Sequence, residues 1–358
     1  MSVRIIIGDV RERLRDLPDE SAHCVVTSPP YFGLRDYGVA GQIGLETTPA
    51  TFVEVMVDVF REVRRVLRSD GTLWLNLGDS YANDGKWGGE TGGKQAYLDD
   101  SSRKRVGREK RITGLKPKDL IGIPWRCAFA LQADGWWLRQ DIIWSKPNPM
   151  PESVTDRCTK AHEYLFLLSK GPRYYYDAEA ILEPVSPNTH ARLSQDVQSQ
   201  IGSERVPGKT NGTMKAVGRG SWKGSTFDGP RDLAVRPDTG RKRAPAGSGI
   251  KNNDSMDAAL AIMPEKRNKR SVWEVTTQPF KEAHFATFPP ALVEPCILAG
   301  CPKGGTVLDP FLGAGTTALV ADRLGRNCIG VELNPEYAAM AERRIRKDAP
   351  MFADVVAA

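Results

Sequence analysis

The sequence has no closely spaced pair of cysteines and no long apolar run. Its six cysteines are scattered along 358 residues, and none forms a Cys-x-x-Cys pair, so neither a zinc site nor a disulfide framework is expected. No segment approaches the roughly 18 apolar residues that a membrane span requires. The first residues lead straight into an apolar strand and lack the apolar stretch of a signal peptide. We therefore expect a cytoplasmic protein with reduced thiols, no metal and no membrane segment.

A strong charge of one sign is also missing, because the net charge is only +6. Such a balance permits a polyanionic partner without requiring one. Hydrophobic residues make up 40% of the chain, which is enough for a substantial core. The length fits one large domain or two modest ones.

Residues 1–180 predict an α/β domain, because short apolar segments alternate with helical patterns. The apolar residues of 51–67 recur every three or four positions, which predicts an amphipathic helix. Alternating strands and helices are typical of a parallel, doubly wound sheet. The predicted strands are 5–7, 24–27, 72–75, 142–144 and 164–168.

Two polar segments interrupt this pattern. Residues 83–116 are rich in glycine, lysine and arginine and nearly free of aliphatic side chains, which predicts a flexible basic loop. The longer segment is 181–270, and residues 190–271 hold 16 lysines and arginines against 8 aspartates and glutamates. Composition leaves two interpretations open here: a solvated linker, or a segment that becomes ordered on nucleic acid.

Residues 271–350 return to regular α/β texture and contain a complete βαβ unit. The predicted elements are a strand at 306–309, a helix at 316–324, a strand at 328–332 and a helix at 335–346.

The turn after the first of these strands reads Asp-Pro-Phe-Leu-Gly-Ala-Gly-Thr-Thr over 309–317. Its glycines let the backbone approach a ligand closely. Nineteen residues beyond Gly313, Glu332 ends the next strand, where an acid can hydrogen-bond ribose hydroxyls. No lysine follows the second glycine, which argues against a P-loop, and Ala318 weakens a dinucleotide site without excluding it; a purely structural turn is the third alternative. Asp309 would repel a pyrophosphate and suits a positive sulfonium or ammonium group, which favours S-adenosylmethionine.

A second motif, Thr27-Ser28-Pro29-Pro30-Tyr31, directly follows a predicted strand. Consecutive prolines give a stiff, extended loop whose carbonyls point outward. One such carbonyl and the Ser28 hydroxyl can accept hydrogen bonds from the amino group of a base. Tyr31 offers a flat face on which a base turned out of a duplex can stack. Taken alone, an ordinary turn explains this motif about equally well.

Together, 27–31 and 309–317 resemble the amino-group DNA methyltransferases. The catalytic motif precedes the cofactor motif, which is the order of the circularly permuted beta class. The resemblance implies a Rossmann-like, S-adenosylmethionine-dependent methyltransferase fold with a mixed, mostly parallel seven-stranded sheet. It also implies that 1–180 and 271–350 form one catalytic domain and that 181–270 is an inserted target-recognition region.

The resemblance extends to the cofactor residues. Gly8-Asp9 resembles the segment near the cofactor's adenine, 284–289 the element around its methionine end, and 330–334 the ribose-binding strand. The cofactor-binding residues implied are Asp9, Thr27, Phe288, Asp309, Phe311, Gly313, Ala314, Gly315, Thr316, Thr317, Glu332, Leu333 and Asn334.

The implied catalytic residues are Ser28, Pro29, Pro30 and Tyr31. An exocyclic amine is a poor nucleophile because its lone pair is delocalised into the ring. Acceptors on Ser28 and on the Pro29 carbonyl would hold its hydrogens and free that lone pair to attack the sulfonium methyl group. Within the family, serine at the first motif position is more typical of N4-cytosine enzymes and aspartate of N6-adenine enzymes. We therefore expect N4 of cytosine, with N6 of adenine as the alternative.

Three further residues are candidates for DNA contact, and one cysteine is a candidate for different chemistry. Lys146, Asn148 and Arg173 are candidate DNA contacts, although solvated-loop or strand roles explain them nearly as well. Cys296 lies in a predicted apolar helix, 291–299, which favours a buried structural thiol over the nucleophile of a C5-cytosine mechanism.

The resemblance implies duplex DNA as the substrate of a bacterial, archaeal or phage enzyme associated with the nucleoid. A homodimer and a cognate restriction endonuclease are left open as partners. Two other function classes are also retained. One is an RNA or protein-amide methyltransferase, and the other is a non-catalytic DNA-binding protein on a methyltransferase scaffold.

Overall fold

The computed structural model describes residues 2–34, 38–82, 113–185, 265–278 and 288–348, and the backbone of 354–357. Most of the predicted loop 83–116 and of the predicted target-recognition region 181–270 lies outside these residues. The chain divides into two compact units, Met1–Ile181 with Asn268–Ala358, and Leu182–Arg267. The described part of the second unit is an antiparallel pair, β6 (Glu183–Pro184) and β7 (Lys266–Arg267), and the function of that unit remains a prediction.

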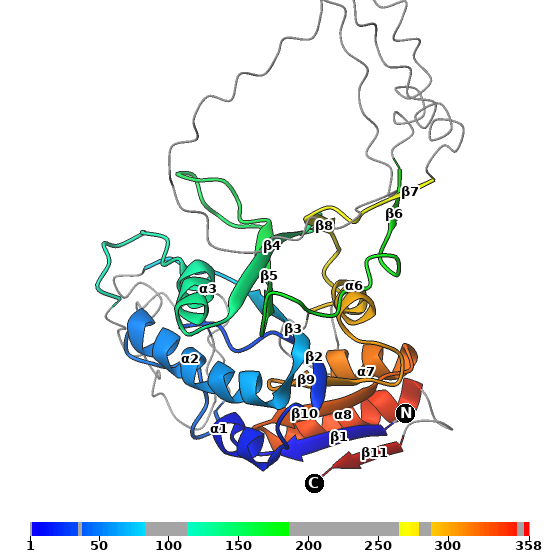
Figure 1. Ribbon diagram of the computed structural model, residues 1–358. Helices are drawn as coiled ribbons and strands as arrows, with labels where there is room; N and C mark the ends of the chain where they lie inside the picture. The colour runs from blue at the N-terminus through cyan, green and yellow to red at the C-terminus, as the bar shows by residue number, and fades with distance from the viewer. Residues whose placement is uncertain are drawn as a thin grey trace, which may run out of the picture. The chain divides into compact units, whose positions relative to one another are not determined.

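Within the described residues of the larger unit, nine strands form one sheet in the order β11-β1-β10-β9-β2-β3-β5-β4-β8 (Figure 1). Among these strands β5 alone runs against the others, so the predicted α/β class with a mixed, mostly parallel sheet is confirmed. The strands are β1 (Ser2–Ile7), β2 (Ala22–Thr27), β3 (Leu67–Leu77), β4 (Trp137–Ser145), β5 (His162–Ser169), β8 (Val272–Glu274), β9 (Thr306–Asp309), β10 (Asn327–Glu332) and β11 (Asp354–Ala357).

The sheet has two strands more than the seven expected. The additional strands are β8 and β11, which pair with β4 and β1 at the two edges. They contain three and four residues. Segments this short contain too few residues to show the alternating pattern by which a strand is recognised. Their position is set by pairing with the neighbouring strand.

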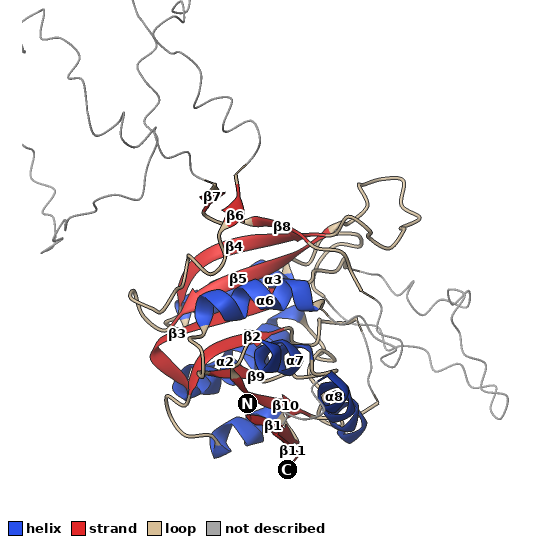
Figure 2. Cartoon of the chain, turned by 90° about the vertical axis from the view of Figure 1, so that its right-hand side faces the viewer, coloured by secondary structure: helices blue, strands red, loops and turns tan. Residues whose placement is uncertain are grey.

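Helices cover both faces of the sheet (Figure 1), and Figure 2 looks onto the face that bears α6, α7 and α8. One face packs against α1, α2 and α3, and the other against α6, α7 and α8. The helices are α1 (Val10–Arg13), α2 (Pro49–Val66), α3 (Ile123–Ala133), α6 (Pro290–Gly300), α7 (Thr316–Arg323) and α8 (Pro335–Asp348), and a 3₁₀ turn at Leu14–Asp16 follows α1.

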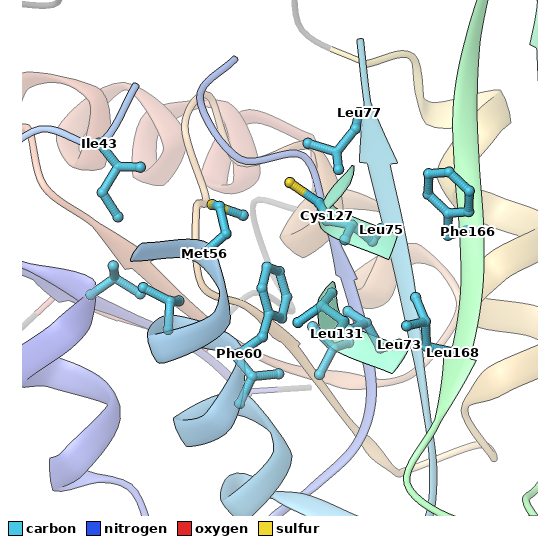
Figure 3. Close-up of a cluster of buried hydrophobic side chains, with 14 of the residues drawn as sticks. Ile43, Met56, Phe60, Leu73, Leu75, Leu77, Cys127, Leu131, Phe166 and Leu168 are labelled. Atoms are coloured by element: carbon cyan, nitrogen blue, oxygen red, sulfur yellow. The ribbon is translucent and has the colours of Figure 1, made fainter. Parts of the chain in front are cut away.

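The longest helix, α2, shows how local sequence builds this arrangement. The Thr48 side chain caps its start by accepting a hydrogen bond from the N–H of Thr51, and Pro49 occupies the first turn. Its apolar face meets alternate residues of β3 and one face of α3 in a buried hydrophobic cluster that includes Phe60 and Leu75 (Figure 3).

Strand direction determines where a site can form. The carboxyl ends of parallel strands meet at one edge of the sheet, which is where ligands bind in doubly wound folds. Four adjacent strands, β1, β10, β9 and β2, end there, and so do β3 and β4. Because β5 runs the other way, its first residues lie at this same edge, with Glu163 paired to Trp144 and Tyr164 paired to Leu77.

Candidate active site

A buried carboxylate joins the two predicted motifs. Asp309, at the end of β9, is fully buried. It accepts hydrogen bonds from the hydroxyls of Thr27 at 2.7 Å and Thr317 at 2.6 Å, and from the N–H of Phe311 at 3.1 Å. One side chain therefore connects three segments: the end of β2, the turn between β9 and α7, and the first turn of α7.

Burial raises the pKa of Asp309 to about 6, although the hydrogen bonds from Thr317, Thr27 and Phe311 act in the opposite direction. The sequence suggested that this acid suits a positively charged ligand. The structure encloses the carboxylate completely, so it offers the site a nearby negative charge and not a surface contact.

The turn between β9 and α7 depends on two glycines with positive φ, Gly313 at 53° and Gly315 at 78°. A Cβ atom on Gly315 would lie 2.7 Å from the Cβ of Ala341 in α8, so this glycine is needed for close helix packing. Among the described residues, a Cβ atom on Gly313 would meet no atom nearer than the Phe311 carbonyl oxygen at 4.0 Å. In this part of the chain, the space beside Gly313 is therefore open, as a ligand that approaches the backbone requires.

Glu332, at the end of β10, faces the same turn. Its carboxylate accepts hydrogen bonds from the N–H groups of Gly313 at 2.7 Å and of Asn334 at 2.9 Å. Burial is the main cause that raises its pKa. Leu333 separates Glu332 from Asn334 in the chain. The Asn334 side chain accepts a hydrogen bond from the N–H of Glu336 at the start of α8. An acid in this position can accept further hydrogen bonds from ribose hydroxyls.

Asp9 follows β1 at the neighbouring strand end. The N–H of Gly8 donates to the Glu332 carbonyl at 2.9 Å, which brings the start of α1 next to the cofactor turn. Asp9 caps α1 and accepts a hydrogen bond from the N–H of Arg11 at 2.9 Å. A hydrogen bond from the Arg11 guanidinium lowers the pKa of Asp9, and the same guanidinium also donates to the Gly41 carbonyl.

The remaining predicted cofactor residues surround this turn. Phe311 and Phe288 are partly buried, the first against the α2 side of the sheet and the second against the α6 side. Of the predicted segment 284–289, residues 284–287 lie outside the described residues. Arg344 of α8, which sequence reasoning missed, donates to the Ala314 carbonyl and to the Thr316 hydroxyl, both at 3.0 Å. Arg344 was missed because α8 reaches the turn only through tertiary packing.

The Ser-Pro-Pro-Tyr loop begins where β2 ends. Thr27 is held by Asp309, Pro29 is buried, and Ser28 is partly exposed. In the described part of the chain, no hydrogen-bond partner is found for the Ser28 hydroxyl. Tyr31 closes the loop, and its carbonyl accepts from the N–H of Leu34 at 3.3 Å. The Ser28 hydroxyl is thus available to a ligand at a strand end that its neighbours hold in place.

Tyr31 is held at both ends of its ring. A Cβ atom on Gly78 would lie 2.4 Å from Cε2 of Tyr31, so the ring lies directly against the Gly78 backbone. The Tyr31 hydroxyl donates to Glu163 Oε2 at 2.6 Å. The same oxygen accepts from Asn76 Nδ2 at 3.0 Å, and Glu163 Oε1 pairs with Lys146 Nζ. Glu163 and Asn76 were not predicted, because only the reversed direction of β5 places Glu163 here.

The three candidate DNA contacts differ in position. Lys146 lies at the site edge, but its ammonium group is paired with Glu163. The Asn148 side chain makes two hydrogen bonds with the backbone of Thr277, at 3.0 and 3.3 Å, and so anchors the loop after β4. The structure does not bring Arg173 to this edge: it follows β5, and its neighbour Tyr175 binds the carbonyl of Asp70 near the start of β3. The antiparallel direction of β5 is the reason.

Cys296 is buried in α6, and burial raises the pKa of its thiol, so it is protonated and enclosed. Within the described residues, no group of three or more His, Cys, Asp or Glu side chains could hold a metal ion. Nor does any helix in this part of the chain have the length and apolar character to cross a membrane.

The fold, with both motifs at adjacent strand ends, defines an α/β methyltransferase. A family model for DNA methylases matches residues 22–343. M.SmaI, a Type II methyltransferase of Serratia marcescens, is 44% identical over 347 residues, which cover 96% of this chain and 91% of that protein. M.Cfr9I, a Type II methyltransferase of Citrobacter freundii, is 41% identical over 95% of this chain and 86% of its own. The chain belongs to the N6/N4 DNA methylase family and is a DNA methyltransferase, so the predicted family is confirmed.

A solved structure shares the fold at low sequence identity. The PvuII DNA methyltransferase, described as cytosine-N4-specific, has a TM-score of 0.54 and 18% identity, with 96% of this chain and 87% of that chain covered. This likeness concerns the fold alone.

Proposed function

We propose that the protein transfers a methyl group from S-adenosylmethionine to N4 of cytosine in duplex DNA, with the target base turned out of the helix. The observation that carries this proposal is the position of Ser28. Its hydroxyl stands at the end of β2, beside the strand that bears the cofactor turn, and has no hydrogen-bond partner in the described part of the chain. A base placed against it would therefore lie next to the cofactor.

The residues around the glycine turn fit this cofactor. When bound, S-adenosylmethionine supplies an electrophilic methyl group on a positively charged sulfur. The open space beside Gly313 admits a ligand close to the backbone, and Glu332 can accept from ribose hydroxyls. The buried charge of Asp309 favours a cation nearby, because charges interact more strongly in a dry interior.

The catalytic loop acts by positioning. The hydroxyl of Ser28 and the carbonyl of Pro29 accept the hydrogens of the amino group, so that the lone pair on nitrogen is no longer shared with the ring. Tyr31 holds the base by stacking, which contributes about 1–3 kcal/mol per base and offsets part of the cost of removing it from the duplex. Fixed acceptors of this kind lower the barrier without reorganising during the reaction.

Ser28 also decides the choice of base in this proposal, since serine at this position is typical of the N4-cytosine members of the resembling family. Residues 181–270 supply target recognition, and their surplus of lysine and arginine suits contact with phosphates.

The test is methyl transfer from isotopically labelled S-adenosylmethionine to duplex DNA, structured RNA and a protein mixture in parallel. We expect label in duplex DNA alone. A Ser28→Ala variant should lose about 100-fold or more in rate while it still binds the cofactor. Label in RNA or protein and not in DNA would contradict the proposal.

A further inference from the structure

We propose that Glu163 is a positioning residue that holds Tyr31 in the orientation a flipped base requires. The inference rests on the proposed function and extends it to a residue outside both motifs. It starts from the 2.6 Å hydrogen bond that the Tyr31 hydroxyl donates to Glu163 Oε2.

Both oxygens of this carboxylate are engaged. Oε2 accepts from Tyr31 and from Asn76 Nδ2, and Oε1 pairs with Lys146. The side chains of Glu163 and Lys146 are only 13% and 18% exposed. Burying an ion pair is a poor way to gain stability, because removing two charges from water costs about as much as their attraction returns. An ion pair at the edge of an active site is better explained by what it holds in place.

What it holds is the ring of Tyr31. Gly78 lies against one side of that ring, and any side chain there would collide with it. The hydroxyl at the far end of the ring is fixed by Glu163. The hydrogen bond to the charged carboxylate fixes the position of the hydroxyl end, and the contact with Gly78 restricts rotation of the ring about its own axis, so its orientation is set before a base arrives. The hydroxyl is also occupied, which leaves the ring surface as the part of Tyr31 that meets a base.

Lys146 has a defined part in this arrangement. Its ammonium group neutralises Glu163 and lies 4.3 Å from the centre of the Trp144 ring. Without Lys146, the nearly buried carboxylate would lose its salt-bridge partner. This geometry assigns Lys146 to the support of Tyr31 and not to a DNA phosphate.

The test compares Tyr31→Phe, Glu163→Leu, Glu163→Gln and the double variant Tyr31→Phe/Glu163→Leu in the full chain. The measurements are kcat and KM for methylation of plasmid DNA, and the Kd for S-adenosylmethionine. We expect Tyr31→Phe and Glu163→Leu each to lower kcat by about ten-fold or more, because each removes the hydrogen bond between the Tyr31 hydroxyl and the carboxylate. The double variant should be no slower than the slower single variant, since both changes remove the same contact. Glu163→Gln should recover most of the rate, because its amide oxygen can still accept from the Tyr31 hydroxyl.

A matched control is Glu62→Gln in α2. Glu62 also forms a partly buried ion pair, with Arg65, but near the end of the helix that leads into the start of β3, at the opposite edge of the sheet. Its rate should equal that of the wild type. Cofactor Kd values within two-fold of wild type in all variants would show that each chain is folded.

Three outcomes would overturn the inference: a wild-type rate for Glu163→Leu, a wild-type rate for Tyr31→Phe beside a slow Glu163→Leu, or losses that multiply in the double variant. If Glu163→Leu does not fold, the inference is judged from the other two single variants: Tyr31→Phe should be slow, and Glu163→Gln should keep most of the wild-type rate. If the wild-type chain itself does not methylate DNA, the proposed function fails and not merely this role of Glu163.

Discussion

Thr27 and Asp309 stand 282 residues apart in the chain, yet the hydroxyl of Thr27 donates to the buried carboxylate of Asp309 at 2.7 Å. Thr27 precedes the catalytic loop, and Asp309 precedes the cofactor turn. The hydrogen bond therefore sets the distance between the place where a base would bind and the place where the cofactor would bind. Thr317 completes the link from α7.

Removing the Thr27 hydroxyl should loosen both the base-binding site and the cofactor site. Thr27→Val keeps the shape of the side chain but leaves Asp309 with one donor fewer, so we expect a stability loss of about 1–3 kcal/mol. Cofactor affinity should also fall. Thr72→Val is a matched control, because Thr72 is equally buried on the adjacent strand β3 and its hydroxyl contacts Trp74 and Cys24 instead. Chemical denaturation and calorimetric cofactor titration measure the two effects. Equal cofactor affinity in the two variants would contradict the link.

Asp309 should give stability a characteristic pH dependence. Its pKa is about 6 in the folded chain, against 3.8 for an ordinary aspartate. Between these values the folded protein keeps a proton that the unfolded chain has released. Stability from this group is therefore highest below pH 4, falls as the pH rises to about 6, and is constant above about 7; the total is on the order of 3 kcal/mol. Denaturation midpoints from pH 4 to 8 should show this fall in the wild type relative to Asp309→Asn.

Cofactor binding should have the opposite pH dependence. A positively charged sulfonium favours ionised Asp309, so affinity for S-adenosylmethionine should weaken as the pH drops below 6, by up to about ten-fold per pH unit. Glu332 also has a raised pKa, and the comparison with Asp309→Asn isolates the contribution of Asp309. Identical pH profiles for the two proteins would show that Asp309 does not sense the cofactor.

Gly315 should be more sensitive to substitution than another glycine with the same backbone conformation. Gly315→Ala adds a methyl group 2.7 Å from Ala341 at φ 78°, whereas Gly304→Ala at φ 75° meets no atom of the described residues within 4 Å. Both variants bear the strain of positive φ, but only the first forces α7 and α8 apart. We expect Gly315→Ala to cost about 1–3 kcal/mol more than Gly304→Ala in thermal or chemical unfolding. Equal losses would mean that the helices adjust freely.

Much of the fold could be predicted from local pattern. Helix α2 lies within two residues of the predicted 51–67, because its apolar side chains line one face. Helix α3 was not predicted, since its apolar residues are not confined to one face and Phe129 is 55% exposed. The edge strands β8 and β11 were missed because a few residues that pair only at a sheet edge carry no periodicity.

The site divides in the same way. Ser28, Asp309 and Glu332 could be identified because each ends or directly follows a recognisable strand. Glu163 and Arg344 could not, because they reach the site from β5 and α8 through tertiary packing. Glu163 does immediately precede an apolar strand, but the direction of that strand, which places it beside Tyr31, is a property of the whole sheet.

The most direct test of the central claim is the identity of the methylated nucleoside. The chain is expressed in cells that lack their own DNA methylation, and the digested DNA is analysed by mass spectrometry beside DNA from cells that express Ser28→Ala. We predict N4-methylcytosine with the intact chain and its near absence with the variant. N6-methyladenine in its place would contradict the assignment of the base, and no methylated nucleoside would contradict the proposed reaction.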